Sequence, residues 1–150
     1  MTRNDGRSSQ PAWALPMVLL LAAAACSRGE PRPAEVDTRH DACVRCRMTV
    51  SDARFAAQIA APREEPMFFD DIGCLRDYLA ASPRLPPGAV AFVADHRTGA
   101  WVRAARAVYT RKETLDTPMA SHLVAHADAA SRDADPAAAG GTPATARGIF

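Results

Sequence analysis

The chain has 150 residues, of which 48% are apolar and 23% are charged, and its formal net charge is +1 at pH 7. A chain of this length suffices for one small domain with a modest hydrophobic core. The even charge balance, without any basic run, argues against nucleic acid as a partner.

Residues 1–25 are typical of an export signal. Arg3 and Arg7 lie in the polar start, and the apolar stretch ALPMVLLLAAAA that follows is shorter than the roughly 20 residues of a membrane-spanning helix. Small residues then precede Cys26, as in the lipobox of bacterial lipoproteins, where the cysteine is acylated. We therefore expect Cys26 to be the lipid attachment site. The alternative is an ordinary signal peptide that is cut near Ala25.

An exported lipoprotein faces the periplasm from a bacterial membrane, and we expect this one to be anchored to the outer membrane through its acyl chains. Residues 1–25 contain two arginines and one aspartate, so the remaining chain balances 16 basic against 16 acidic residues. The polar, proline-containing segment 26–40 is predicted to be a flexible tether. Residues 41–150 then form the folded domain.

The first part of the domain is predicted to contain a hairpin and a helix. Strands are expected at 54–60 and 67–70, with a turn between them. A helix is expected over 70–82, with Asp70 or Asp71 as its N-cap. Its apolar face recurs at helical spacing and consists of Ile72, Leu75, Tyr78 and Leu79. Cys74 lies beside this face and is expected to be a buried, inert thiol, with metal ligation as a reserve role.

The second part repeats a similar order. Three further strands are expected at 89–95, 100–104 and 107–110. The alanine content and the spacing of Leu123 and Ala127 predict a helix over 120–135. The end of the chain, 142–150, is expected to form an edge strand or a tail. This order predicts an α+β fold with small antiparallel sheets and helices, arranged as two ββαβ-like units.

Three cysteines remain after Cys26, namely Cys43, Cys46 and Cys74, so one thiol lacks an intramolecular partner in an oxidising compartment. A c-type haem is excluded because Arg47 stands where C-x-x-C-H needs histidine. A zinc site needs four ligands, usually from two such pairs. A redox C-x-x-C and a structural disulfide, Cys43–Cys46 or Cys46–Cys74, stay open.

A cuprous site explains the methionines as well. Thiolate and thioether sulfur select the soft Cu(I) ion. On an extended backbone, Cys46 and Met48 would point to the same face. Met119 follows a proline in a segment without apolar periodicity and is the candidate third sulfur ligand. His122 offers an imidazole and His126 is a weaker option, although a solvated surface position is expected for both.

Four motifs occur in a characteristic order: CVRCRM, FDDIGC, VADHRTGAWVRAARAVY and TPMASH. Behind a lipobox, this order resembles the NosL family of nitrous oxide reductase accessory lipoproteins. The resemblance implies repeated ββαβ units and a Cu(I)-binding chaperone that is not an enzyme. Its partners would be a copper exporter or donor and nitrous oxide reductase. The family's C-G-M motif falls on Cys46 and Met48, and the methionine of its T-P-M-G motif falls on Met119.

Two positions depart from the family pattern. The glycine between Cys46 and Met48 is Arg47, and the glycine after Met119 is Ala120. The cation of Arg47 is expected to lower the pKa of Cys46. These departures would also fit a carrier that serves another periplasmic cuproenzyme. The remaining alternative is an exported thiol–disulfide or disulfide-stabilised lipoprotein with a partner-binding role.

Overall fold

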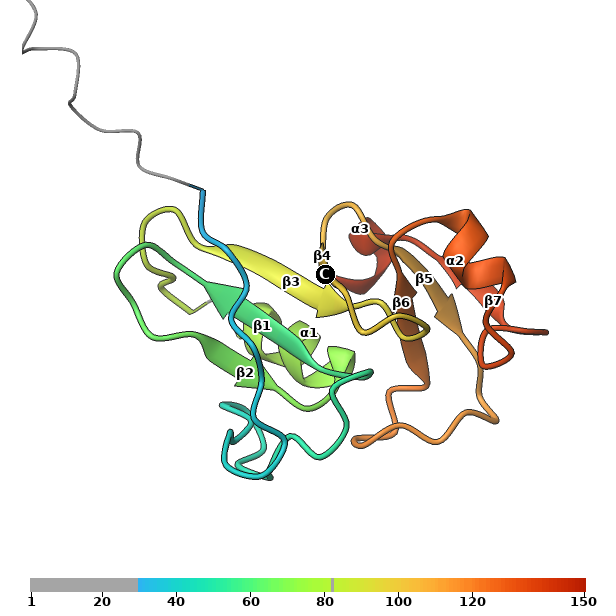
Figure 1. Cartoon of the computed structure of the whole chain (residues 1–150), viewed down its shortest axis with the longest axis horizontal. Helices are drawn as coiled ribbons and strands as arrows, with labels where there is room; N and C mark the ends of the chain where they lie inside the picture. Colours follow the sequence, from blue (N-terminus) through green and yellow to red (C-terminus); the bar gives the residue numbers. More distant parts are fainter. Residues whose placement is uncertain (1–29, 82) are drawn as a thin grey trace, which may run out of the picture.

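The computed structural model describes residues 30–81 and 83–150 (Figure 1). The predicted signal segment 1–25 and the predicted lipid attachment site Cys26 lie outside the described residues. In the described part, no helix has the length and apolar character needed to cross a membrane.

Two antiparallel sheets lie side by side (Figure 1). The first has the order β2-β1-β3-β4 and the second has the order β6-β5-β7. The strands of the first sheet are β1 (Ala57–Ala60), β2 (Met67–Phe69), β3 (Val90–Ala94) and β4 (Trp101–Arg103). Those of the second sheet are β5 (Val108–Arg111), β6 (Leu123–His126) and β7 (Thr142–Ala144). The helices are α1 (Ile72–Ala80), α2 (Ala129–Asp133) and α3 (Ala146–Ile149).

The two units share one topology. In each unit the first strand lies between the second and the third, and a helix connects the second strand to the third. The predicted α+β fold with two ββαβ units is therefore confirmed. The predicted strand at 100–104 is β4, which extends the first sheet instead of opening the second unit.

The helix predicted over 120–135 is wrong in its first half. Ala120 and His122 have φ values of 53° and 58°, which no right-handed helix accommodates. The next four residues are all buried and pair with β5 as the strand β6. Tertiary pairing thus overrides the helical spacing, and α2 begins only after its N-cap Asp128, whose side chain accepts a hydrogen bond from the Ser131 amide.

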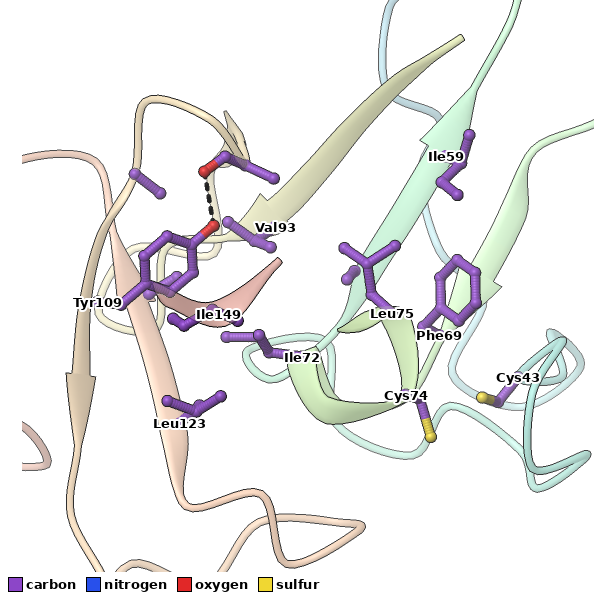
Figure 2. Packing of buried hydrophobic residues seen from close by; sticks show 14 residues of the cluster. Cys43, Ile59, Phe69, Ile72, Cys74, Leu75, Val93, Tyr109, Leu123 and Ile149 are labelled. Atoms are coloured by element: carbon purple, nitrogen blue, oxygen red, sulfur yellow. Dashed lines mark hydrogen bonds between the residues drawn. The ribbon is translucent and has the colours of Figure 1, made fainter. Parts of the chain in front are cut away.

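One hydrophobic core joins the two sheets. The helix α1 contacts β1 and β2 of the first sheet and β6 of the second. Its residues Ile72 and Leu75 pack into a cluster with Val93 and Leu123 (Figure 2). The Tyr109 hydroxyl lies in the same cluster and donates to the Ala104 carbonyl at 2.7 Å. The predicted apolar face of the helix is therefore the face that builds the core.

The start of the described chain contacts the first sheet. The amide group of Gln58, a fully buried residue of β1, makes two hydrogen bonds of 2.9 Å with the backbone of Ala34. Ala34 and Val36 also pack against a small cluster of Val50, Ala56 and Phe68. The chain thus packs against the domain more than twenty residues before β1 begins at Ala57.

A buried carboxylate, Asp95, connects the sheets at the end of β3. Its Oδ2 accepts hydrogen bonds from the Ser131 hydroxyl at 2.7 Å and the Ala127 amide at 2.8 Å, both in the second unit. Its Oδ1 accepts the amides of Arg97 and Thr98 in its own turn at 3.0 Å. Burial alone would raise the pKa of Asp95, but these hydrogen bonds outweigh it and lower the pKa to about 2.

We predict that Asp95 makes the fold acid-sensitive. Because the pKa of Asp95 is depressed in the folded state, its contribution to the free energy of unfolding is present above about pH 4. That contribution is lost as the pH falls towards 2. Over that interval the wild type should lose on the order of 2 kcal/mol more unfolding free energy than Asp95→Asn. Chemical denaturation at stepped pH measures this. The exposed control Asp133→Asn should behave as wild type, and equal slopes for wild type and Asp95→Asn would contradict the prediction.

Candidate metal centre

The chain reverses direction between Cys43 and Met48. The Cys43 amide donates to the Met48 carbonyl at 2.8 Å, and the Arg47 amide donates to the Cys43 carbonyl at 2.9 Å. The flanking residues Ala42 and Thr49 form an antiparallel bridge. The expected extended backbone between Cys46 and Met48 is therefore wrong, because a tight turn separates the two side chains.

This turn explains why the family motif has a glycine at the position of Arg47. Arg47 has a φ of 69°, in the left-handed region that glycine adopts without penalty. Ala120, directly after Met119, also has a positive φ, of 53°. Each non-glycine residue there costs about 1–2 kcal/mol of backbone strain. The motif glycines thus mark two positions where the backbone itself requires positive φ.

Three thiols and one carboxylate converge beneath this turn. Cys43 and Cys74 are buried, with 0% and 4% of their surface exposed, and Cys46 is half-buried. All three are free thiols. Their sulfur atoms and a carboxylate oxygen of Asp70 lie within 4.8 Å of one another. Figure 2 shows the sulfurs of Cys43 and Cys74 at the edge of the core, on the turn and on α1.

Two adjacent aspartates hold this region together. The Cys46 thiol donates to Asp70 Oδ1 at 3.4 Å. Asp71 is the N-cap of α1, since its Oδ1 accepts the Gly73 amide. Its Oδ2 accepts the Met119 amide at 3.0 Å, across 48 residues of sequence. The predicted capping role is confirmed for Asp71, and the same side chain also positions the backbone of Met119.

Two of the thiols are shifted towards their protonated form. Burial is the main cause that raises the pKa of Cys46; a hydrogen bond from the Met48 backbone opposes it, and the hydrogen bonds with Cys43 and Asp70 raise the pKa further. Burial and Asp70 also raise the pKa of Cys74. The expected lowering by Arg47 is therefore wrong. A metal ion that binds here must displace thiol protons.

A small cavity opens beside the thiols. Its volume is about 150 Å³, and Cys46, Cys74 and Met119 all line it. Arg45, Gly73, Arg76 and Asp77 complete the lining. Met48 does not line it and is 54% exposed, whereas Met119 is 42% exposed. The structure thus brings two of the three predicted sulfur ligands to one cavity, and leaves the third exposed on the neighbouring turn.

The histidines near the predicted site are otherwise engaged. The half-buried His122 ring donates a hydrogen bond from Nδ1 to the Leu115 carbonyl at 2.9 Å. Only its Nε2 could therefore serve as a ligand without breaking this hydrogen bond. His126 is fully buried at the end of β6, so the expected solvated position is wrong for it. All four residues of β6 are buried. The burial of His126 was not expected because this segment was predicted to be a helix with a solvated face.

The family model described as NosL matches residues 33–149. The chain belongs to the NosL family. Neither the comparison with curated proteins nor the comparison with solved structures gave a match. Membership of this copper-binding accessory family, which is not a known enzyme family, makes the Cys/Asp cluster a candidate copper site.

Sequence reasoning anticipated only part of the centre. Cys74 lines the cavity, whereas its place beside the apolar helix face indicated a buried thiol with metal ligation only as a reserve role. Asp71 was recognised as a cap from its place before Ile72, but its contact with Met119 depends on tertiary structure. No local signal in the sequence points to a contact across 48 residues.

We predict that Arg47→Gly stabilises the protein. It removes the strain at φ 69°, partly offset by the greater freedom of glycine in the unfolded chain, for a net increase of roughly 0.5–1 kcal/mol in unfolding free energy. Urea denaturation measures it. The matched control is Arg45→Gly in the same turn, where φ is not positive, and it should destabilise. Destabilisation by both variants would refute the strain argument.

We predict that Asp71→Asn releases the Met119 loop. Asparagine has a single carbonyl oxygen, which can cap α1 or accept the Met119 amide but cannot do both in the observed geometry. Stability should fall by about 1 kcal/mol, and the Met119 amide should exchange faster with solvent deuterium. Asp77→Asn, at an exposed ion pair with Arg76, is the control and should change neither. Unaltered protection of Met119 would contradict this role for Asp71.

Proposed function

We propose that the protein is a lipid-anchored Cu(I) carrier that delivers copper for the maturation of nitrous oxide reductase. The observation that carries the proposal is the cavity shared by Cys46 and Met119 in a chain of the NosL family. These two sulfur-bearing residues are 73 positions apart in the sequence and belong to different motifs. Their convergence on one small cavity is the arrangement that a soft metal ion requires.

The proposed ligands are Cys46, Met48 and Met119. Cu(I) displaces the proton of Cys46, the most accessible of the three clustered thiols, and the thioether of Met119, which lines the same cavity, is the second ligand. Met48 is exposed and follows Cys46 by two residues, so a rotation of its flexible side chain completes a three-sulfur site.

This ligand set favours transfer over storage. Thioether sulfur is uncharged and binds Cu(I) more weakly than thiolate does. Both methionines are well exposed, so an incoming ligand from a partner reaches the ion before Cys46 has to leave. Cys43 and Cys74 are more deeply buried than Cys46, and burial together with Asp70 raises the pKa of Cys74, so that thiol keeps its proton.

The predicted export signal and the membership of the NosL family support the following cellular role. Acylation of Cys26 would keep the carrier on the periplasmic side of the outer membrane, and the chain already contacts the domain at Glu30, which pairs with Arg103 of β4. A copper exporter or donor would load the site. Nitrous oxide reductase, or another periplasmic cuproenzyme, would receive the ion.

A second candidate function is thiol–disulfide chemistry. It is favoured by one observation, that the sulfurs of Cys43, Cys46 and Cys74 lie within 4.8 Å of one another. Reactive cysteines of oxidoreductases, however, have depressed pKa values, because the thiolate is the nucleophile. The pKa values of Cys46 and Cys74 are raised, so the metal-carrier function is the better supported.

Anaerobic titration of the reduced protein with Cu(I) against a chelator tests the proposal. We expect one tightly bound copper per chain, lost in Cys46→Ala because the only charged ligand is removed. Met119→Leu and Met48→Leu should each weaken copper affinity by about tenfold or more, because leucine has a similar size to methionine but lacks the sulfur ligand. The competition curve reports each affinity directly.

The matched control is Met67→Leu. Met67 is a half-buried residue of β2 whose sulfur contacts the Tyr78 hydroxyl, so its loss should leave copper affinity unchanged. Retention of full affinity in both Met48→Leu and Met119→Leu would reject the three-sulfur site. A dithiol–disulfide couple with no Cu(I) affinity would favour the second candidate function instead.

A further inference from the structure

We propose that His96, His126 and Asp135 form a second metal site, which takes a divalent ion of the zinc or cupric class. None of the three belongs to the sulfur centre, by which we mean the three clustered thiols together with Met48 and Met119. His96 lies in the turn after β3, His126 is the last residue of β6, and Asp135 follows α2. The site is therefore assembled from both sheets, and nothing in the Cu(I) carrier function requires it.

The three side chains already converge on one point. Asp135 Oδ2 lies 2.7 Å from His96 Nδ1 and 2.9 Å from His126 Nε2. One candidate ligand atom from each residue lies within 4.8 Å of the other two. All three residues are nearly inaccessible, with 7%, 0% and 6% of their surface exposed in the same order. Two imidazoles and one carboxylate are a common three-ligand set for a divalent ion.

Insertion of an ion needs only a small expansion. Metal–nitrogen and metal–oxygen bonds of about 2.0–2.2 Å place neighbouring ligand atoms roughly 3.3–3.5 Å apart in a tetrahedral site. The present separations from the carboxylate oxygen are 2.7 and 2.9 Å. Each imidazole therefore has to move by about half an ångström, which side-chain rotation accommodates without a change of fold.

The surroundings support a fixed ligand set. The second carboxylate oxygen of Asp135 accepts the Ala137 amide at 2.9 Å, which orients the group. The Phe55 ring packs beside the His96 ring, with 4.9 Å between the ring centroids. A surface hollow of about 340 Å³ is lined in part by Asp135, so this ligand of the proposed site borders on solvent.

Ligand type separates this site from the sulfur centre. Imidazole and carboxylate suit divalent zinc and copper, whereas thiolate and thioether select Cu(I). A single chain would thus hold a soft monovalent ion in the sulfur centre and a divalent ion at the junction of the two sheets. The divalent ion would bind the same elements that Asp95 connects, so it would raise the stability of the fold by mass action.

Metal binding has a specific consequence for the histidine protons. Asp135 is a carboxylate with a lowered pKa, since hydrogen bonds from both rings outweigh its burial, so the ring nitrogens that face it carry hydrogens. An ion on His96 Nδ1 and His126 Nε2 replaces those hydrogens, so an imidazole that keeps one hydrogen must carry it on its other nitrogen. His126 Nδ1 is buried without a hydrogen-bond partner in the described structure, so this shift weakens binding. We expect affinity nearer to micromolar than to that of closed zinc sites.

The experiment uses the reduced full chain with Cd(II) and with Zn(II). With excess Cd(II), cadmium NMR should show a strongly deshielded resonance from the thiol cluster and a second, shielded resonance from nitrogen and oxygen ligands. The shielded resonance should disappear in His126→Gln and in Asp135→Asn. The matched control is His40→Gln, at the exposed His40–Asp37 pair with a similar 2.8 Å contact, and it should retain both resonances.

Wild-type protein provides a readout that does not depend on the folding of any variant. On addition of Zn(II), proton–nitrogen correlation spectra should show His96 and His126 exchanging tautomers, and the melting temperature should rise with Zn(II) concentration. Unchanged imidazole signals at millimolar Zn(II) would overturn the proposal and leave a purely structural hydrogen-bonded triad. Survival of the shielded cadmium resonance in folded His126→Gln would overturn it as well.

Discussion

The buried pair Asp70 and Asp71 at the start of α1 is the constraint on which the sulfur centre depends. Asp70 accepts the Cys46 thiol, and Asp71 accepts the Met119 amide while it caps the helix. Two segments that are far apart in sequence are thereby attached to the same helix end. Because both carboxylates are almost fully buried, their hydrogen bonds compete little with water and hold the geometry firmly.

The backbone is strained at the two turns that carry the proposed sulfur ligands. Positive φ values at Arg47 and Ala120 bring the chain back on itself directly beside Cys46 and Met119. The proposed ligands therefore lie on turns, and turn residues would keep enough freedom for the proposed exchange with a partner. Strain of this kind persists only where the surrounding structure determines the conformation, and here the core beneath α1 does so.

The repeated ββαβ architecture creates two distinct chemical environments. In the first unit, the turn before β1 and the start of α1 gather thiols around Asp70. At the junction with the second unit, Asp95 and Asp135 gather hydroxyl, amide and imidazole groups from β6 and α2. Soft and borderline ligands are thus separated within one chain. Asp95 also links the sheets, so the stability of the fold and the order of the histidine cluster depend on the same contacts.

The sequence by itself determined the fold class, most strands, the helix α1 with its cap, and the motifs that indicate a NosL-like chain, because these depend on local periodicity and short-range chemistry. Only the tertiary structure decided the strand at Leu123–His126, since its pairing with β5 outweighs a helical spacing. It also decided the turn at Arg47, the raised pKa of Cys46 and the convergence of Cys46, Cys74 and Met119. These features arise from burial and from contacts between distant segments, and neither leaves a periodic trace in the sequence.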